Sequence, residues 1–363
     1  MTIKGLMISA ESASDNSAYS FRIRKLSECL ADNGIETDHL YMADHLLLST
    51  ITTSSLCMLL QLGKLRNYDF ICAGAEEAAH ALFFTRPFLN VPIIYDIHGD
   101  PLAQSALDRQ IRTGRNDAGP ALRVRAVSWM AARSADHLIT VSFAHLKEFA
   151  DLGFPEERMS VLRMGVDLDL FAMQPFPERP KFTFGYAGEF QSWQGIDNLI
   201  EAFELLENHD ARVLVIGFRK EDSVLKSKFA ERFGPRVELI DRTDRKTLIE
   251  LLGSVSILVI PRPDHPAIRH AFSTKFAEYA ALGRPIMVND VDETVDFIRK
   301  YDCGFISEPN PVAMAQVMNQ AARLPRLQLA EMGRRARLMA EENFSWRRVG
   351  EDFAAIVKRV VRK

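Results

Sequence analysis

The most constraining feature of the sequence is an alternation of short apolar runs with longer amphipathic stretches, and it occurs twice along the chain. The apolar runs are bounded by turn residues, as buried strands are, and the stretches between them have helical spacing. Strands that alternate with helices favour a parallel sheet covered by helices. We therefore predict an α/β protein with strands near Gly5–Ser9, Phe70–Cys72, Pro92–Tyr95, His137–Val141, Phe182–Ala187, Val213–Gly217, Val237–Ile240, Ser256–Ile260 and Pro285–Val288.

The alternation is interrupted by a polar stretch, Phe171 to Pro180, that contains three prolines. Such a stretch is typical of a linker between domains. The 363 residues are also enough for two domains of ordinary size. We predict one domain over residues 1–173 and a second over residues 174–344.

Charge and cysteine content exclude several classes of protein. The net charge of −3 does not indicate nucleic-acid binding. The four cysteines, Cys29, Cys57, Cys72 and Cys303, lack the spacing of a zinc site or a redox pair. The N-terminus becomes polar at once, and no apolar run reaches membrane-spanning length. We expect a cytoplasmic protein without a metal or cofactor.

The segment from Phe272 to Pro285 combines a cation and a carboxylate on one predicted helix. Ser273 is a candidate N-cap, so the N–H groups of the first turn, Thr274 included, and the Lys275 ammonium would face a phosphate. Glu278 follows three residues later on the same face and could accept two ribose hydroxyls. The segment is thus predicted to bind a nucleoside diphosphate; an amphipathic helix with a surface Lys and Glu is the alternative.

This segment resembles the "P-x-K-x-x-E-Y-M-A-x-G-x-P" signature of family 4 glycosyltransferases. The resemblance implies a GT-B fold, in which two Rossmann-like domains with parallel sheets face each other across a cleft. It also implies a retaining transfer of a sugar from a nucleotide-diphosphate donor to a hydroxyl acceptor. The expected partners are a nucleotide sugar and a glycan, lipid-linked or small-molecule acceptor, and the nucleotide sugar is a co-substrate.

Other landmarks of the family follow in the expected order. The run from Phe184 to Phe203 resembles the family's first strand, turn and helix of the second domain, with Gly188 at the turn and Gly195 opening the helix. We assign Gly188 to the donor nucleotide site, where phosphates could approach the backbone; a structural turn is the alternative. The run from Phe344 to Phe353 resembles the family's last helix, which implies that residues from about 345 to 363 cross back to the first domain.

The sequence departs from the family at the expected diphosphate site. Many members have an Arg after the glycine at 188 and a Lys before the glycine at 195, whereas this chain has Glu189 and Gln194. The positive charge must then come from Lys275. The predicted phosphate helpers are Arg262, Arg269 and Arg219.

Two histidines are predicted to lie near the donor sugar. His98 is in an element that resembles the family's "D-x-H" at the end of a strand, and we expect it to contact the sugar or the leaving group. His270 occupies the place of a family Glu and is a candidate sugar contact, with an incidental loop histidine as the alternative. Phe272 is assigned to the same sugar site.

The remaining candidates are weaker. Tyr19 and Arg22 lie near a helix start that resembles the acceptor side of some members; for Arg22 a solvated surface position is the alternative. The six arginines from Arg109 to Arg133 suggest a peripheral contact with the inner face of a membrane, or a solvated face. Asp167 and Asp169 form a D-x-D motif, which binds metal in a different glycosyltransferase fold. We interpret it here as a structural turn without metal.

The sequence therefore predicts a metal-independent retaining glycosyltransferase. The family resemblance further implies a role in polysaccharide or lipid-linked glycan synthesis. Glu189, Gln194 and His270 leave a second class open, in which the protein is a catalytically inactive sugar-nucleotide-binding or accessory subunit. A sugar-nucleotide epimerase is a third possibility, and a dinucleotide oxidoreductase is disfavoured because no strand is followed by G-x-G-x-x-G. The nucleobase, the sugar, the acceptor and the oligomeric state do not follow from the sequence.

Overall fold

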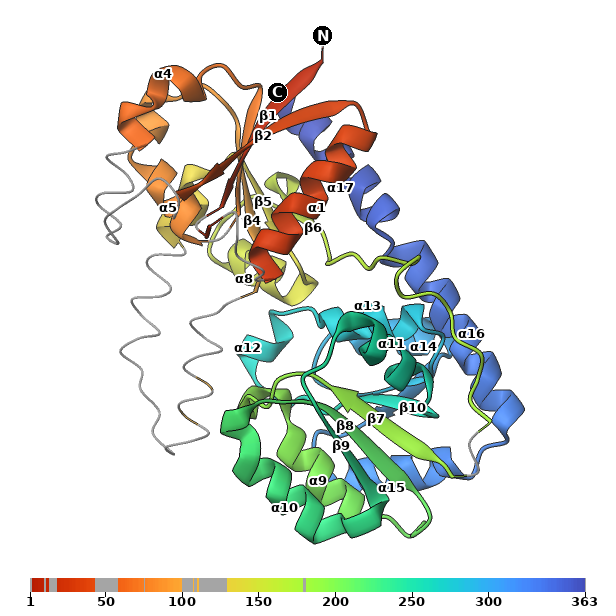
Figure 1. Ribbon diagram of the computed structural model, residues 1–363. Coiled ribbons are helices and arrows are strands. Elements are labelled where there is room, and N and C mark those ends of the chain that lie inside the picture. The colour runs from red at the N-terminus through yellow and green to blue at the C-terminus, as the bar shows by residue number, and fades with distance from the viewer. Residues whose placement is uncertain are drawn as a thin grey trace. The chain divides into compact units, whose positions relative to one another are not determined.

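The chain forms two compact units, shown in the computed structural model of Figure 1. The structure describes residues 2–9, 11–12, 18–42, 58–74, 76–99, 107, 110, 129–178 and 181–362. The units meet along the chain between Met164 and Gly165 and again between Ser345 and Trp346. Unit 1 holds the earlier part of the chain and its last helix, and unit 2 holds residues 165–345. The predicted boundary at 173/174 lies a few residues after the first of these borders.

Unit 1 contains a parallel sheet of six strands in the order β2-β1-β3-β4-β5-β6. Its central strands β3 and β4 are buried along their whole length because helices cover both faces. The four apolar runs predicted in this half each form a strand of the sheet. The strands are β1 (Ile3–Ser9), β2 (Ile35–Tyr41), β3 (Phe70–Gly74), β4 (Ile93–Ile97), β5 (His137–Thr140) and β6 (Met159–Val161).

The last helix of the chain belongs to the core of unit 1. This helix, α17, packs against α1, and the two lie side by side in Figure 1. Its side chains Val349, Phe353 and Val357 are buried with residues of β1 and β3. The helices of unit 1 are α1 (Ala18–Asp32), α4 (Leu62–Leu65), α5 (Glu76–Phe83), α8 (Phe143–Asp151) and α17 (Trp346–Val361), with short 3-10 turns η1 (Arg86–Phe88) and η2 (Glu156–Arg158).

Unit 2 contains a second parallel sheet of six strands, in the order β12-β11-β10-β7-β8-β9. Counted within the unit, this order is the 3-2-1-4-5-6 arrangement of a Rossmann fold. Leu258 of β10 pairs with Gly185 of β7 on one side and Ile286 of β11 on the other. The strands are β7 (Thr183–Ala187), β8 (Arg212–Phe218), β9 (Val237–Asp241), β10 (Ile257–Ile260), β11 (Ile286–Asn289) and β12 (Gly304–Ser307).

Helices flank this sheet, and an aromatic core with Phe184, Phe203 and Phe229 fills one face. The helices are α9 (Ile196–Glu204), α10 (Ser223–Phe233), α11 (Arg245–Gly253), α12 (Pro266–Arg269), α13 (Thr274–Ala281), α14 (Thr294–Tyr301), α15 (Pro311–Ala322) and α16 (Arg326–Asn343), with 3-10 turns η3 (Ser192–Gln194), η4 (Lys220–Asp222) and η5 (Gly234–Arg236). The predicted fold class, with parallel sheets in both halves, is confirmed.

The buried Arg284 binds the segment around Gln174, which follows the border between the units, to the rest of unit 2. Its guanidinium donates hydrogen bonds to the carbonyl oxygens of Gln174, Pro175 and Gly253. Burial lowers the pKa of Arg284 to about 10, but the group stays charged at neutral pH. The carbonyl oxygens therefore satisfy a charge that the apolar surroundings would otherwise disfavour.

Candidate functional site

The strand order of unit 2 creates a switch point between β7 and β10, and ligands of open α/β sheets bind outside the carboxyl ends of the strands at such a point. The backbone is unusually close-packed there. Gly195 has a φ of +74°, and a Cβ at this position would collide with the carbonyl group of Pro261 after β10. Only glycine allows the two loops to approach this closely.

The helix α13 begins at Thr274, beside this switch point, and its start agrees with the helix that the sequence predicted after Ser273. Ser273 occupies the N-cap position, but its side chain makes no capping hydrogen bond. The helix ends at Ala281, and Gly283 with a φ of +69° reverses the chain. The N–H group of Phe276 donates to the carbonyl oxygen of Ser273 at 3.1 Å. The N–H groups of Thr274 and Lys275, at the first two positions of the helix, have no intrahelical acceptor and are suited to an anion.

Lys275 extends along the loop that follows β7. Its Nζ donates a hydrogen bond to Oε1 of Gln194 at 2.7 Å and lies 5.3 Å from the ring centroid of Tyr186. A Cβ on Gly188 would come within 2.6 Å of this Nζ. The missing side chain at 188 therefore makes room for Lys275 itself. Burial, assisted by the charge of Arg262, lowers the pKa of Lys275 to about 7.

Glu278 lies on the same helix and has a cationic partner that the sequence did not indicate. Nη1 of Arg245, the first residue of α11, is 3.2 Å from Oε1 of Glu278. Burial raises the pKa of Glu278, while the charges of Arg245 and Lys275 oppose this shift. A ribose that bonds to Glu278 would meet a carboxylate already oriented by Arg245.

Each predicted helper arginine has a carboxylate partner of its own. Arg262 is buried and bonds to Asp292 at 3.0 Å. Arg269 bonds to Asp264 at 2.6 Å, and both side chains are about half exposed. Only Arg262 is close enough to lower the pKa of Lys275.

Glu189, the residue that departs from the family pattern, forms an ion pair with Arg219. The backbone carbonyl of Glu189 also accepts a hydrogen bond of 2.9 Å from the Tyr186 hydroxyl. Arg219 thus neutralises the carboxylate that would repel a diphosphate. Because this ion pair carries no net charge, it does not replace the cation absent at position 189, and the helper role predicted for Arg219 stays a prediction.

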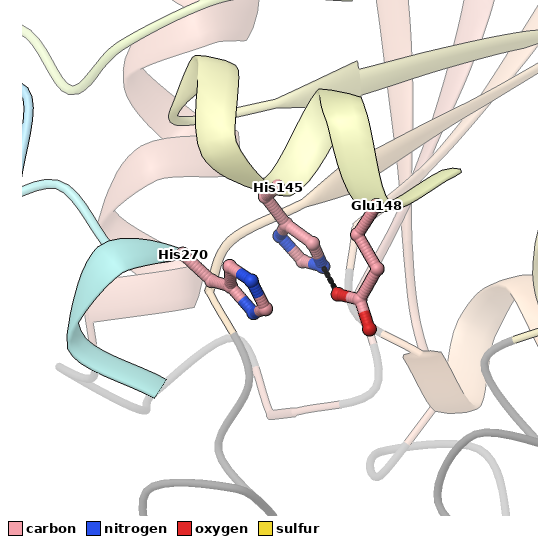
Figure 2. A group of neighbouring side chains, drawn as sticks. All are labelled: His145, Glu148 and His270. Atoms are coloured by element: carbon pink, nitrogen blue, oxygen red, sulfur yellow. Dashed lines mark ion pairs between the residues drawn. The ribbon is translucent and has the colours of Figure 1, made fainter. Parts of the chain in front are cut away.

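The two residues assigned to the donor sugar have different environments. Figure 2 shows His270 immediately after α12. Phe272 is buried in an aromatic cluster, 5.3 Å from Phe344 and 6.0 Å from Phe276 between ring centroids. Phe272 therefore packs in the core of unit 2. The roles predicted for both residues stay predictions.

Figure 2 also draws His145 and Glu148, which lie one turn apart on α8 of unit 1. Their Nε2 and Oε2 atoms are 4.0 Å apart. Ser142, the N-cap of α8, accepts a hydrogen bond from the backbone N–H of His145. The pair is thus held on a well-capped helix, and no motif in the sequence had indicated it.

In unit 1, His98 follows β4 at the carboxyl edge of the sheet, as predicted. Burial, with the nearby charge of Arg22, lowers its pKa to about 4, so the imidazole is neutral at physiological pH. A neutral imidazole can accept or donate one hydrogen bond without repelling a cation. Its contact with a donor sugar stays a prediction.

Arg22 is fully buried, contrary to the solvated surface position considered for it, and its predicted acceptor-side role stays a prediction. Its guanidinium makes a bidentate pair with Asp96 at 2.7 and 3.0 Å and donates to the carbonyl oxygens of Leu162 and Arg163. Arg22 therefore joins β4 to the chain that leaves β6. The side chain of Tyr19 lies outside the described residues.

Two other expectations concern turns and surfaces. Oδ1 of Asp167 accepts hydrogen bonds from the backbone N–H groups of Asp169 and Leu170, at 3.1 and 3.0 Å, as expected for a structural turn. The basic stretch from Arg109 to Arg133 lies mostly outside the described residues. Within it, Arg133 stacks on the Trp129 ring. Among the described helices, none combines the length and the apolar character that crossing a bilayer requires.

Comparisons with known proteins agree with this architecture. Residues 23–170 match the family described as Glycosyltransferase Family 4, and residues 171–339 match Glycosyl transferases group 1. None of the curated proteins matches the sequence.

Similar solved structures include sucrose-phosphate synthase from Thermosynechococcus elongatus, with 16% identity, a TM-score of 0.77 and 99% of each chain covered. A glycosyltransferase from Rickettsia africae has 16% identity and a TM-score of 0.77, with 100% of this chain and 99% of that chain covered. Anabaena HepE in complex with UDP has 15% identity and a TM-score of 0.72, with 99% and 100% covered. The two family matches and the shared fold show that the chain belongs to the family 4 glycosyltransferases with the GT-B fold.

Proposed function

We propose that the protein is a retaining glycosyltransferase that moves a sugar from a nucleotide-diphosphate donor to a hydroxyl acceptor. The observation that carries this proposal is the pairing of Lys275 and Glu278 at the start of α13, beside the switch point of unit 2. The family match supports the transfer itself. The fold is shared with HepE, which was solved with UDP, and this favours a nucleotide-sugar donor.

In the proposed reaction the bond from the anomeric carbon to the diphosphate oxygen breaks, which leaves an oxocarbenium-like sugar and a diphosphate anion. Lys275 and the first-turn N–H groups of α13 stabilise the negative charge that develops on this leaving group. In this proposal Lys275 supplies the positive charge that replaces a metal ion, because Arg219 and Arg262 are each already paired with a carboxylate. The acceptor hydroxyl attacks the same face and gives its proton to the departing phosphate oxygen.

Glu278 binds the donor at the ribose. Its carboxylate can accept hydrogen bonds from two neighbouring hydroxyls while Arg245 holds it in place. Since an oriented carboxylate loses less conformational entropy on binding, Arg245 improves the affinity without touching the reacting atoms. A glycan or lipid-linked molecule is the acceptor class that the family resemblance favours.

Calorimetric titration with UDP-, GDP- and ADP-sugars tests the donor site. We expect one nucleotide to bind selectively, and Lys275→Ala and Glu278→Ala to weaken it at least tenfold, because each removes a charge-assisted hydrogen bond. Arg299→Ala, which removes an exposed cation from α14 of the same unit, is the matched control. A folded wild type that binds none of these donors would refute the assignment.

A second candidate function is donor binding without transfer. It is favoured by Gln194, which leaves Lys275 with a neutral partner where many relatives have a lysine. Slow hydrolysis of the bound donor distinguishes the two functions, because a competent site releases some sugar to water even without its acceptor. Tight binding with no donor cleavage, with or without candidate glycan acceptors, would support the non-catalytic alternative.

A further inference from the structure

Unit 1 contains a pocket of about 270 Å³ at the edge of the sheet where β4 and β5 begin. His98 follows the opposite end of β4, at the carboxyl edge where substrates of parallel sheets bind. The pocket is therefore on the edge that the proposed reaction does not use. Its lining residues are Arg86, Asn90, Pro92, Asp136, His137, Arg158 and Val360.

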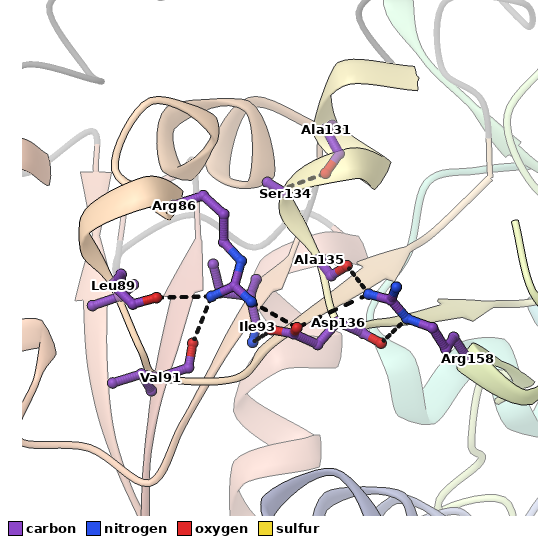
Figure 3. Close-up of polar contacts among 9 residues, drawn as sticks. All are labelled: Arg86, Leu89, Val91, Ile93, Ala131, Ser134, Ala135, Asp136 and Arg158. Atoms are coloured by element: carbon purple, nitrogen blue, oxygen red, sulfur yellow. Dashed lines mark hydrogen bonds and ion pairs between the residues drawn. The ribbon is translucent and has the colours of Figure 1, made fainter. Parts of the chain in front are cut away.

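Two arginines of this pocket are fixed around one carboxylate (Figure 3). Arg86 donates to Oδ1 of Asp136 at 2.7 Å and to the carbonyl oxygens of Leu89 and Val91 at 2.8 and 3.4 Å. Arg158 donates to the carbonyl oxygens of Asp136 and Ala135, each at 2.9 Å. These bonds hold both guanidinium groups in place before any ligand arrives.

The carboxylate does not balance this positive charge. Oδ2 of Asp136 already accepts the backbone N–H of Ile93 at 2.9 Å, and Arg158 approaches Oδ1 only to 3.9 Å. A third cation, Arg359, bonds through Nη2 to Ser160 and to His137 of the lining. The described residues that line the pocket or bond to its lining thus include three guanidinium groups and one carboxylate.

Hydrogen-bond donors also remain unused at the pocket. Among the described residues, Nη1 of Arg158 has no hydrogen-bond partner, and neither has the exposed carboxamide of Asn90. Preorganised guanidinium groups with spare N–H donors match the geometry of phosphate oxygens. We propose that this pocket is a second ligand site, which binds a small phosphate-bearing anion in unit 1.

Calorimetric titration of the full chain with inorganic phosphate and with a hexose 6-phosphate tests the proposal. We expect saturable binding that Arg158→Gln weakens about tenfold, the typical loss of a charge-assisted hydrogen bond. Asn90→Trp should block the pocket by volume, and it removes no hydrogen bond seen among the described residues. Circular dichroism and thermal unfolding check that each variant is folded.

Two control variants locate the binding. Arg347→Gln removes an exposed arginine at the start of α17, about 20 Å along the helix from Val360, and should leave the affinity unchanged. Lys275→Ala removes the phosphate-binding cation of the donor site of unit 2, and saturable binding at the pocket of unit 1 should persist in this variant. Binding that survives in folded Asn90→Trp, disappears in Lys275→Ala, or is absent from the wild type would overturn the proposal.

Discussion

Lys275 combines a candidate role in binding a diphosphate with a pKa close to neutrality. Its pKa of about 7 results from burial and from the charge of Arg262. Gln194 supplies a hydrogen-bond acceptor but no compensating negative charge. A bound diphosphate would supply that charge and would raise the pKa of the ammonium. Donor binding should therefore take up a proton above neutral pH.

The prediction is that donor affinity falls as the pH rises from 7 to 9, by up to about tenfold per pH unit, because the free protein loses the Lys275 proton. Calorimetry in buffers of different ionisation enthalpy measures the proton uptake directly. In Lys275→Met the affinity should be low and independent of pH over this range. Equal proton uptake by the wild type and by Lys275→Met would assign the effect to another group.

The same shift predicts how Lys275 affects stability without donor. Lys275 has a pKa of about 10.4 in the unfolded chain and of about 7 in the folded protein. Below pH 7 the lysine is protonated in both the folded and the unfolded state, and the cost of burying its charge is fully present. Between pH 7 and the pKa of the unfolded lysine, the unfolded state binds more protons than the folded one, so the stability of the folded state rises with pH. The stability gained by Lys275→Met should therefore be largest near pH 6 and shrink towards pH 10. Chemical denaturation across this range measures it.

Residues within one contiguous motif could be predicted from the sequence, but their partners could not. Lys275 and Glu278 share a helix turn, so their common face followed from spacing alone. Arg245 is 33 residues away from Glu278, and Asp292 is 30 residues away from Arg262. Such pairs depend on which loops the sheet order brings together. The buried position of Arg22 was missed for the same reason, since its partner Asp96 lies on a strand 74 residues later.

At the scale of elements, the junction of β7 and α9 depends on Gly195. Alanine at this position would adopt a φ of +74° and would also collide with the carbonyl group of Pro261. We expect Gly195→Ala to reduce the free energy of unfolding by about 3 kcal/mol and to abolish donor binding. Gly34, at the turn before β2 of unit 1, has a nearly equal φ of +75° but no neighbour within 4 Å of an added Cβ.

Gly34→Ala therefore isolates the backbone strain, which should cost about 1 kcal/mol and leave donor binding intact. Urea denaturation of both variants compares these costs. If the two substitutions cost the same, the close approach of the loops at the switch point would not contribute to stability.

Strand prediction succeeded for the central strands of both sheets and for one edge strand, β9. The nine predicted apolar runs all became strands, and eight of them are central strands, which are continuously apolar in parallel sheets. The three missed strands are β2, β6 and β12, at the edges of the two sheets. In β2 only Ile35 is fully buried, and β6 has three residues. An edge strand needs fewer apolar residues, so its sequence carries less signal.

At the scale of the whole molecule, each unit has its own hydrophobic core, so we expect the two units to unfold with different free energies of unfolding. The residues proposed to bind the donor nucleotide, Lys275 and Glu278, belong to unit 2, whereas α17 at the end of the chain completes the core of unit 1. Phe353 of α17 is fully buried, and truncating such a side chain costs about 3–5 kcal/mol. Donor at 100 times its dissociation constant stabilises the unit that binds it by about 2.7 kcal/mol.

Differential scanning calorimetry should therefore resolve two transitions. Phe353→Ala should lower the melting temperature of one of them, and saturating nucleotide sugar should raise that of the other. Phe143→Ala provides the control, since this phenylalanine of unit 1 is 61% exposed and should shift neither transition appreciably. If Phe353→Ala and the donor instead moved one common transition in opposite directions, the two cores would unfold as a single cooperative unit, and the C-terminal helix would control the stability of the donor site as well as that of its own sheet.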